Sequence, residues 1–418
     1  MFFGVVDTLS SDSAESKDSK GPTAPRKRVI WLQNNADHYF VQMLDALNAQ
    51  GDVEYFGVFL CPPPTGNVLH QLPKASPHVF LGEPAATAAP GGAAGSGSVP
   101  AHRKLGPAAR DYIKKLNFSA AIIGGYDSHF KRWVLHYCKS RGIPTAMFAD
   151  SNIRAERGRT LKKKLKRFAK RIFLQRIINQ VDRVIPFNRC GVAYWRYYGC
   201  PANKISRSTC LCAVDVPAAL AVNREELFAR YKVPADCKLI FTAARLVPVK
   251  ALHLMVEAFS KTGLAEQGWV WAVAGDGPLR QELEQQAGKL NGSAIRFLGA
   301  VAPIDIPALM AQSELFVLPS VYEPHGIVVT EAMAVGTPVI AADCCGAARD
   351  LVRKGNTGWL FKTGDADSMR MVLAQATRDL PRLKAMRPAC AGVFTRWYGQ
   401  YSPIVSVPRL AADWLSSF

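Results

Sequence analysis

Residues 319–342 constrain the fold of this 418-residue chain more than any other stretch. They follow an apolar run, 315–318, that predicts a buried parallel strand. Two carboxylates, Glu323 and Glu331, stand on either side of Gly326, where the next helix is predicted to begin. The free N–H groups at the start of a helix suit an anion, and a glycine lets backbone approach a ligand. The stretch therefore predicts a strand, a turn with an anion site and two acids, and a helix.

Strands and helices alternate along the chain in two similar halves. In the first half, apolar runs predict strands at 29–32, 53–60, 120–124, 145–148, 181–187 and 206–212. In the second half, strands are expected at 238–243, 269–274, 295–298, 314–318, 338–341 and 358–361. Such alternation predicts two doubly wound parallel sheets, with a ligand cleft between the carboxyl ends of their strands.

The composition along the chain predicts four segments. Residues 1–25 are rich in Ser, Asp, Lys and Pro, as disordered segments are. Residues 26–216 form a first Rossmann-like domain with a flexible Ala/Gly/Pro/Ser-rich insert at 83–101. Residues 217–385 form a second domain. Residues 386–418 form a helical tail that either packs on its own domain or crosses back to the first.

Charge and cysteine content limit the classes to which the protein can belong. The net charge of +19 favours an anionic partner, such as a nucleic acid, an acidic membrane or a phosphate-bearing ligand. No apolar run approaches the ~20 residues that span a bilayer. The first residues include an acid and no basic segment, which is not typical of a signal peptide, so a cytoplasmic protein is expected. The 10 cysteines have no metal-ligand spacing, and reduced, buried thiols are expected.

A basic segment at 154–180 is the second strong signal. Leu161, Leu165, Phe168 and Ile172 recur at helical spacing, and nine lysines and arginines lie between 157 and 171. Glu156 is the only acid between 154 and 176. Such a helix can lie on an anionic membrane surface. Alternatively, its apolar stripe packs on the core while its cations face water. Nucleic acid is the weaker expectation, because no aromatic-interleaved RNA motif accompanies the charges.

The stretch around Glu323 and Glu331 resembles the E-x7-E signature of family four of the retaining glycosyltransferases. The likeness includes both glutamates, the glycine between them and the Gly336-Thr337-Pro338 turn. The resemblance implies a GT-B fold, in which two Rossmann-like doubly wound domains face each other across a cleft. It covers most of residues 238–365 and extends only loosely over the first domain.

Further segments of the second half match the same family in the expected order. Arg245 and Lys250 follow a predicted strand, with Ala244 in place of the family's glycine. The resemblance implies that these two cations grip a nucleotide diphosphate, for which a guanidinium fork and a compact ammonium are suited. Gly275 and Gly277 match a Gly-Asp-Gly-Pro turn whose small residues let the strand end approach the nucleotide.

The resemblance also assigns roles within the E-x7-E stretch. It implies that Glu323 contacts hydroxyls of the donor sugar, that Glu331 contacts the ribose, and that backbone N–H groups of Gly326 and Ile327 lie near the distal phosphate. His325 replaces a residue that is often aromatic or apolar, and either touches the donor or packs internally. The downstream matches at Gly346, Asp350 and 356–358 are interpreted as structural.

The first half departs from the family pattern. Residues 33–36 replace the family's Gly-Gly pair, and Asp150 stands where many members carry a histidine that helps bind the donor sugar. Asp150 could position sugar or acceptor, act as a base, or cap the next helix. The turn at 124–126 is a second candidate for the pocket wall, together with Asp127 and His129.

The resemblance as a whole implies transfer of a hexosyl unit from a nucleotide-diphosphate sugar to a hydroxyl acceptor, with retention at the anomeric carbon. No cofactor is implied, and no Asp-x-Asp motif indicates a metal. With the basic helix, a lipid-linked surface glycan at the inner face of a membrane is the expected acceptor. Two alternatives stay open: a sugar-nucleotide epimerase on the same fold, and a non-catalytic protein that binds nucleotide sugar or anionic lipid.

Overall fold

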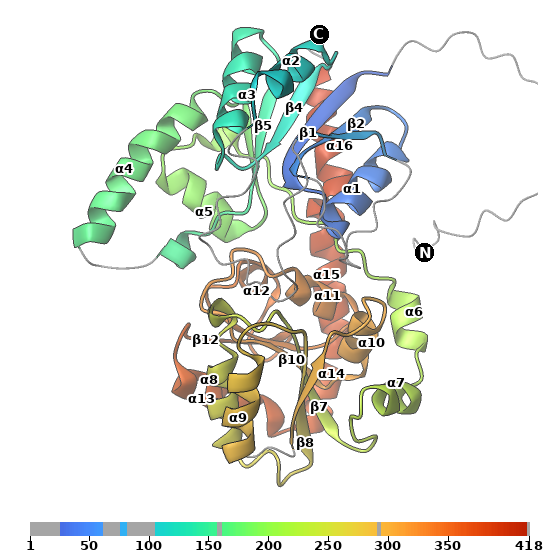
Figure 1. The fold of residues 1–418 in the computed structure, drawn as a ribbon. Coiled ribbons are helices and arrows are strands. Elements are labelled where there is room, and N and C mark those ends of the chain that lie inside the picture. Colours follow the sequence, from blue (N-terminus) through green and yellow to red (C-terminus); the bar gives the residue numbers. More distant parts are fainter. Residues whose placement is uncertain (1–25, 62–75, 82–104, 157–160, 291–293, 416–418) are drawn as a thin grey trace, which may run out of the picture.

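The computed structural model describes residues 26–61, 76–81, 105–156, 161–290 and 294–415. The expected disordered segment 1–25 and the insert 83–101 lie outside the described residues. Two parallel six-stranded sheets, each flanked by helices on both faces, form two domains stacked one on the other (Figure 1). This is the predicted fold class.

The sheet of the first domain has the strand order β3-β2-β1-β4-β5-β6, and every pairing is parallel. Its strands are β1 (Arg28–Asn35), β2 (Glu54–Cys61), β3 (His78–Phe80), β4 (Ala120–Gly124), β5 (Thr145–Ala149) and β6 (Arg183–Pro186). The helices between them are α1 (His38–Asn48), α2 (Pro107–Lys115), α3 (His129–Ser140), α4 (Leu161–Ile178) and α5 (Arg189–Tyr197). All five residues of β4 and of β5 are buried, as expected of a parallel sheet covered on both faces.

The sheet of the second domain has the order β12-β11-β10-β7-β8-β9 and is also parallel throughout. Its strands are β7 (Lys238–Ala243), β8 (Trp269–Ala274), β9 (Ile295–Gly299), β10 (Leu315–Leu318), β11 (Val339–Ala342) and β12 (Gly358–Phe361). Its helices are α6 (Val216–Ala221), α7 (Arg224–Arg230), α8 (Leu252–Ser260), α9 (Arg280–Leu290), α10 (Asp305–Gln312), α11 (Ile327–Ala334), α12 (Gly346–Leu351) and α13 (Ala366–Thr377).

Each sheet reverses its strand order at one point. In the first domain the chain leaves β1 toward β2 on one side and later adds β4 on the other. In the second domain, β7 and β10 are neighbours in the same way. At such a switch point the loops after the two strands diverge to opposite faces and leave a crevice, which is where open α/β sheets bind ligands. The two crevices are therefore the first places to look for a site.

The expected strand at 206–212 is wrong. The segment follows β6 for only a short distance, with bonds from Ser206 N to Val184 O (2.9 Å) and from Ser208 N to Pro186 O (3.3 Å). The next amide, that of Thr209, donates to the carbonyl of Tyr401 at 2.8 Å. The segment is apolar and extended, but it turns away to meet the C-terminal helices, so it forms no ladder. The short strand β3 was not predicted.

Three helices end the described chain: α14 (Leu380–Ala385), α15 (Arg387–Tyr401) and α16 (Pro403–Leu415). α15 packs on the second domain against α11, whereas α16 lies against α1 of the first domain (Figure 1). Gln50 donates to the carbonyl of Ile404 at 2.8 Å, and Val407, Leu410 and Trp414 join the core around β1. The C-terminal helices thus connect the two domains a second time.

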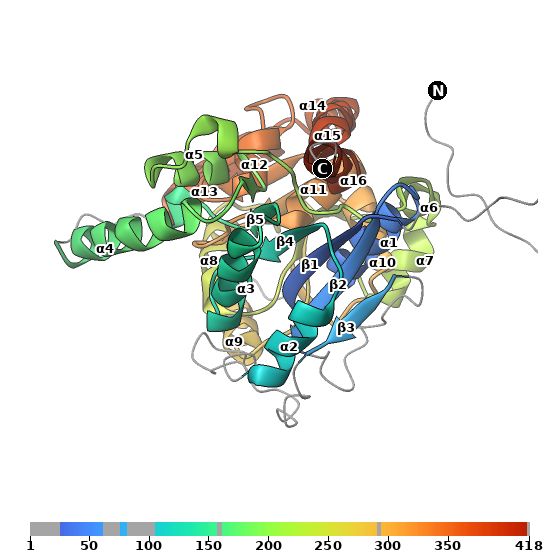
Figure 2. The same cartoon turned by 90° about the horizontal axis from the view of Figure 1, so that it is seen from above.

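Helix α4 projects from the first domain (Figures 1 and 2). Its C-terminal turns are anchored, because Leu174, Ile177 and Ile178 are buried in the core. Leu165 and Phe168, by contrast, are 68% and 63% exposed, and Ile172 is also exposed. The alternative in which these side chains pack on the core is therefore wrong. None of the described helices is both long and apolar enough to cross a membrane.

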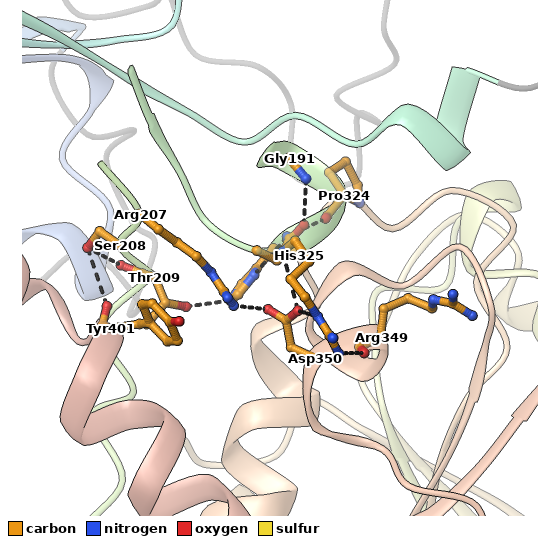
Figure 3. Close-up of polar contacts among 11 residues, drawn as sticks. Gly191, Arg207, Ser208, Thr209, Pro324, His325, Arg349, Asp350 and Tyr401 are labelled. Atoms are coloured by element: carbon orange, nitrogen blue, oxygen red, sulfur yellow. Dashed lines mark hydrogen bonds and ion pairs between the residues drawn. The ribbon is translucent and has the colours of Figure 1, made fainter. Parts of the chain in front are cut away.

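The two domains meet through a buried carboxylate (Figure 3). Asp350 in α12 accepts a hydrogen bond from Nε of Arg189 at 2.9 Å and pairs with the guanidinium of Arg207. Its side chain is 1% exposed. Arg207 also stacks over the ring of Tyr401, with its guanidinium carbon 3.9 Å from the ring centroid. One buried acid therefore forms ion pairs with two cations of the first domain.

Two buried asparagines add neutral contacts between the domains. Asn188 donates to the carbonyl of Pro324 at 3.0 Å, and Asn152 donates to the carbonyl of Cys344 at 2.7 Å. Asn152 is also 3.3 Å from the Pro324 oxygen. The first domain therefore grips the backbone immediately after Glu323.

We expect the substitution Asp350→Asn to lower the free energy of unfolding by about 3 kcal/mol, because it leaves a mostly buried guanidinium without its anion. Urea denaturation followed by tryptophan fluorescence measures the change. The matched control is Asp367→Asn, which removes an exposed acid that pairs with Arg370. Because exposed pairs contribute little, the control is expected to change stability only slightly. Equal losses in the two variants would contradict the proposed importance of this contact.

Candidate functional site

The loops that follow β7, β8, β9 and β10 lie side by side and are joined by backbone hydrogen bonds. Ala244 N donates to Ala274 O at 3.0 Å, and Leu246 N donates to Asp276 O at 2.9 Å. Gly275 N donates to Gly299 O at 2.7 Å. The segments that were matched separately in the sequence thus form one continuous surface at the carboxyl edge of the second sheet.

Two glycines make this close approach possible. A Cβ on Gly275 would lie 2.0 Å from the carbonyl oxygen of Ala244, and one on Gly277 would lie 2.5 Å from that of Leu246. Gly275 also has a φ of +128°, which disfavours side chains. Both glycines are therefore required by the packing of loop on loop, and they keep this edge of the sheet free of side chains.

The switch point between β7 and β10 brings opposite charges together. Lys250, in the 3₁₀ turn that follows β7, forms an ion pair with Glu323, which follows β10. Ser320 Oγ donates to the same carboxylate at 3.1 Å. Both charged side chains are mostly buried. Arg245, from the same loop as Lys250, is exposed.

Gly326 allows helix α11 to start directly above the strand. Its φ of +89° is left-handed, and a Cβ there would lie 2.6 Å from Sγ of Cys345. Helix α11 begins at Ile327, and the first amides of a helix have no carbonyl partner within it. The N-terminus of α12 is different, because Ala347 N donates to His325 O at 2.8 Å. Of these two helix starts, α11 is the better suited to an anion.

Glu331 is held by a residue of the first domain. It lies in α11, is buried, and accepts a hydrogen bond from the hydroxyl of Tyr39 in α1 at 2.9 Å. Burial raises the pKa of Glu331, while the bond from Tyr39 favours its ionised form. The second acid of the E-x7-E stretch thus faces the cleft between the domains.

His325 is buried in the domain interface. Its ring lies 3.5 Å from the amide of Asn188 and 3.4 Å from the hydroxyl of Thr209, and it meets Phe187 edge to face. Burial and the nearby Arg207 charge lower the pKa of His325 to about 4, so the ring is neutral at physiological pH. These contacts connect His325 to the first domain.

The first domain contributes a cavity of about 580 Å³ at its own switch point, between the ends of β1 and β4. Its wall combines three carboxylates, two amides, two tyrosines and several apolar rings, and the described lining contains no lysine or arginine. The lining residues are Gln33, Asn34, Asp37, Tyr39, Phe40, Met43, Gly124, Gly125, Tyr126, Asp127, Phe148, Ala149, Asp150, Ser151, Phe187, Cys210 and Leu211.

Asp150 follows β5 and faces this cavity. Desolvation and the negative charge of Glu323 raise the pKa of Asp150 to about 7. The two carboxylates therefore interact across the cleft. Among the described residues, Asp150 makes no capping bond to the turn at Ile153–Glu156, and Asn152 Oδ1 accepts from Arg154 N instead, at 2.9 Å.

Asp127 also lines this cavity and is held by two partners. It pairs with Lys131 at 2.8 Å and accepts from the amide of Asn34 at 2.8 Å. Burial opposes ionisation, but Lys131 and Asn34 hold the pKa of Asp127 below its ordinary value. Lys131 is fully buried and also donates to the carbonyl of Gly124. Its positive charge therefore interacts with groups of the cavity wall and not with the cavity interior.

The structure brings most of the sequence-based candidates to one cleft. Lys250, Glu323, Gly326, Ile327 and Glu331 surround the switch point of the second domain, with Arg245, Gly275 and Gly277 on adjoining loops. His129 is exposed at the start of α3 and does not line the cavity. Among the described residues, no group of three or more His, Cys, Asp or Glu side chains is arranged to hold a metal ion.

The sequence interpretation missed three polar residues. Tyr39, Asn152 and Asn188 all reach the second domain from the first. Asn152 and Asn188 each follow a predicted strand, and this placement could have marked them as candidates. Tyr39 lies within a helix, and nothing local distinguishes it from an ordinary surface tyrosine.

Comparison with known proteins identifies the second half of the chain most firmly. Residues 223–389 match the sequence model of the family described as Glycosyl transferases group 1. Alpha-D-kanosaminyltransferase of Streptomyces kanamyceticus is 30% identical over 179 residues, which are 41% of this chain and 46% of that protein. The chain spans about half or less of the length of the curated relatives it matches.

Solved structures match over nearly the whole chain. Sucrose-phosphate synthase from Thermosynechococcus elongatus superposes with a TM-score of 0.73 at 17% identity, covering 94% of this chain and 100% of that one. The Anabaena protein HepE in complex with UDP gives a TM-score of 0.69 at 18% identity, with the same coverage. The chain therefore has the GT-B fold, and its second domain carries the region that matches group 1 glycosyl transferases.

Proposed function

We propose that this protein transfers a hexosyl unit from a nucleotide-diphosphate sugar to a hydroxyl acceptor, with retention at the anomeric carbon. The observation that carries the proposal is the pairing of Lys250 with Glu323 at a sheet switch point, directly beside the N-terminus of α11. Such a site offers a cation and helix amides to a diphosphate and a carboxylate to sugar hydroxyls. UDP bound to HepE, a structure with the same fold, is consistent with a nucleotide donor.

The chemistry follows from where charge develops. As the glycosidic bond breaks, negative charge grows on the departing diphosphate, so Arg245, Lys250 and the α11 amides stabilise the transition state more than the ground state. The acceptor attacks from the same face that the diphosphate leaves, which gives retention without a protein nucleophile. We propose that the reaction needs no metal, because cationic side chains supply the charge neutralisation.

The cavity of the first domain supports a glycan acceptor. Carboxylates and amides bind hydroxyl groups, and the rings of Phe40, Phe148 and Phe187 can pack against the apolar face of a sugar. Its acidic wall suits an uncharged sugar better than a phosphate. Asp150, whose pKa of about 7 lies near physiological pH, is placed to hold the acceptor hydroxyl or to take its proton.

The exposed face of α4 supports a lipid-linked acceptor in surface polysaccharide synthesis. Leu165, Phe168 and Ile172 form an exposed apolar stripe beside exposed cations, including Lys164, Lys166 and Arg171. A stripe of this kind can enter the headgroup region of an anionic membrane while the cations meet lipid phosphates. The protein would then act as a peripheral enzyme at the inner face of the membrane.

The substitutions Arg245→Ala, Lys250→Ala and Glu323→Gln are each expected to lower kcat/KM at least about 100-fold, corresponding to roughly 3 kcal/mol of lost transition-state stabilisation. A panel of nucleotide-diphosphate sugars, first screened by thermal shift, identifies the donor, and release of nucleoside diphosphate measures turnover. Glu266→Gln, an exposed acid in the same domain, is the control. Full activity of Glu323→Gln would overturn the proposed site.

The same assay separates the alternatives. An epimerase would convert the donor sugar with no acceptor present, and a non-catalytic binder would be stabilised by donor without releasing diphosphate. NMR of the product anomer tests retention. Loss of transfer after chelation, with recovery on adding a divalent cation, would contradict metal independence.

Because the pKa of Asp150 is raised, the free energy of unfolding is expected to fall as the pH rises. Between pH ~4 and ~7 the unfolded chain ionises this carboxyl while the folded protein keeps it protonated, so the folded state loses stability as pH rises. The substitution Asp150→Asn removes this loss. We expect its melting temperature relative to wild type to increase from pH 4 to pH 7 and then to level off.

Asp127→Asn provides a control of opposite sign. Its pKa is lowered, so its charge stabilises the folded state above pH ~4, and its removal leaves buried Lys131 unpaired. This variant is expected to be less stable than wild type at pH 7. Parallel pH profiles for the two variants would contradict the assignment of Asp150 as a protonated acid near neutrality.

We expect the triple substitution Leu165→Ser, Phe168→Ser and Ile172→Ser to weaken binding to anionic vesicles at least about tenfold, since about 0.8 kcal/mol is lost for each CH₂ no longer buried. Vesicle flotation measures the partitioning. The matched control removes three apolar side chains that are exposed elsewhere, Leu220, Ile304 and Met371. Equal partitioning of wild type onto anionic and neutral vesicles would contradict the membrane contact.

A further inference from the structure

A second hollow, lined by arginines, lies beside the domain interface. It has a volume of about 530 Å³ and is lined by residues of the 3₁₀ turn η3 (Ile153–Glu156) and of α4, α5 and α12. The lining residues are Ile153, Arg154, Arg167, Arg189, Cys190, Ala193, Tyr197 and Arg349. Ser151 and Phe187 line the acidic cavity, whereas Ile153 and Arg189 line this hollow. The buried Asn152 and Asn188 therefore stand between the two spaces, which have opposite charge.

The hollow carries more positive charge than its nearby acids can neutralise. Arg154 pairs with Asp343 at 3.0 Å, and Arg189 pairs with Asp350, which Arg207 also neutralises. Arg349 lies within ion-pair distance of no carboxylate in the described part of the chain. Its guanidinium extends away from Asp350 (Figure 3). An anion in the hollow would thus meet cations that the protein's own acids do not cancel.

These cations act on one common point. Cys190 lines the hollow, and the positive charges of Arg154, Arg349 and Arg189 each lower the pKa of its thiol, although burial and Asp350 raise it overall. The three guanidiniums line the hollow from η3, α12 and α5, so both domains contribute cations to it. A single small anion could contact groups of both domains at once.

We propose that this hollow is a binding site for a phosphate or diphosphate group. Guanidinium forks bind phosphate oxygens bidentately, and several of them around one concave space are typical of phosphate recognition. Arg154, Arg167 and Arg189 supply the first-domain side, and Arg349 supplies the second-domain side. The group can belong to a lipid, since the membrane-facing stripe lies on the same helix as Arg167, or to a soluble metabolite. The site is independent of the proposed transfer reaction.

Calorimetric titration with inorganic pyrophosphate tests the site. The protein carries Arg245→Ala throughout, so that the proposed donor pocket contributes less to binding. Adding Arg349→Gln is expected to weaken pyrophosphate binding about tenfold, the loss of one charge-assisted hydrogen bond. Arg378→Gln, an exposed arginine at the end of α13, is the matched control and is expected to have no effect.

A second variant guards against an indirect effect of the first. Ala193→Trp fills the hollow from the exposed face of α5 without removing a charge, and it is also expected to weaken pyrophosphate binding. Circular dichroism verifies that both variants are folded. Unchanged affinity in folded Arg349→Gln and Ala193→Trp would overturn the proposal.

Vesicle flotation identifies the source of the phosphate. Phosphatidylcholine vesicles with and without phosphatidic acid are compared for wild type, Arg349→Gln and Arg378→Gln. A selective loss of phosphatidic acid-dependent binding in Arg349→Gln assigns the hollow to a lipid phosphate. Weaker pyrophosphate binding with unchanged flotation assigns it to a soluble phosphate. Because no sugar nucleotide is present, neither result depends on whether the protein transfers sugar.

Discussion

The backbone of residues 323–325 carries Glu323 of the proposed donor site and is also a contact between the domains. Two buried asparagines of the first domain donate to its carbonyl groups, and the amides at the start of α12 donate to it from below. Glu323 is thus positioned by both domains. The loop that carries Glu323 is held by second-domain amides as well as by Asn152 and Asn188 of the first domain.

The two switch points bring groups of opposite charge to the two sides of the cleft. On the second-domain side, Arg245, Lys250 and the start of α11 present positive charge. On the first-domain side, Asp37, Asp127 and Asp150 present carboxylates in a wall whose nearest cation, Lys131, is buried and paired. An anionic leaving group and an uncharged hydroxyl compound have opposite requirements. In the proposed reaction, each sheet meets one of these requirements with its own loops.

The sequence located site residues best where the local backbone geometry itself requires a particular residue type. Gly275, Gly277 and Gly326 occupy positions where a side chain would collide with a neighbouring loop, so local pattern was enough to locate them. Asp150 was located too, but its raised pKa comes from desolvation and from the charge of Glu323, which is 173 positions away. The bond between Tyr39 and Glu331 and the course of 206–212 depend on how separate elements dock. No local periodicity encodes such contacts.

The cations behind the net charge of +19 fall into two groups, those that are paired within the fold and those that are exposed. Arg207, at the interface, pairs with the buried Asp350 and serves the fold. Lys164, Lys166 and Arg171 on α4 are exposed, and Arg349 lines the hollow. Unneutralised charge kept close together raises the energy of the folded protein by self-repulsion. The concentration of cations beside an exposed apolar stripe, on one projecting helix and the adjoining hollow, is the observation behind the proposed anionic partner on that side of the molecule.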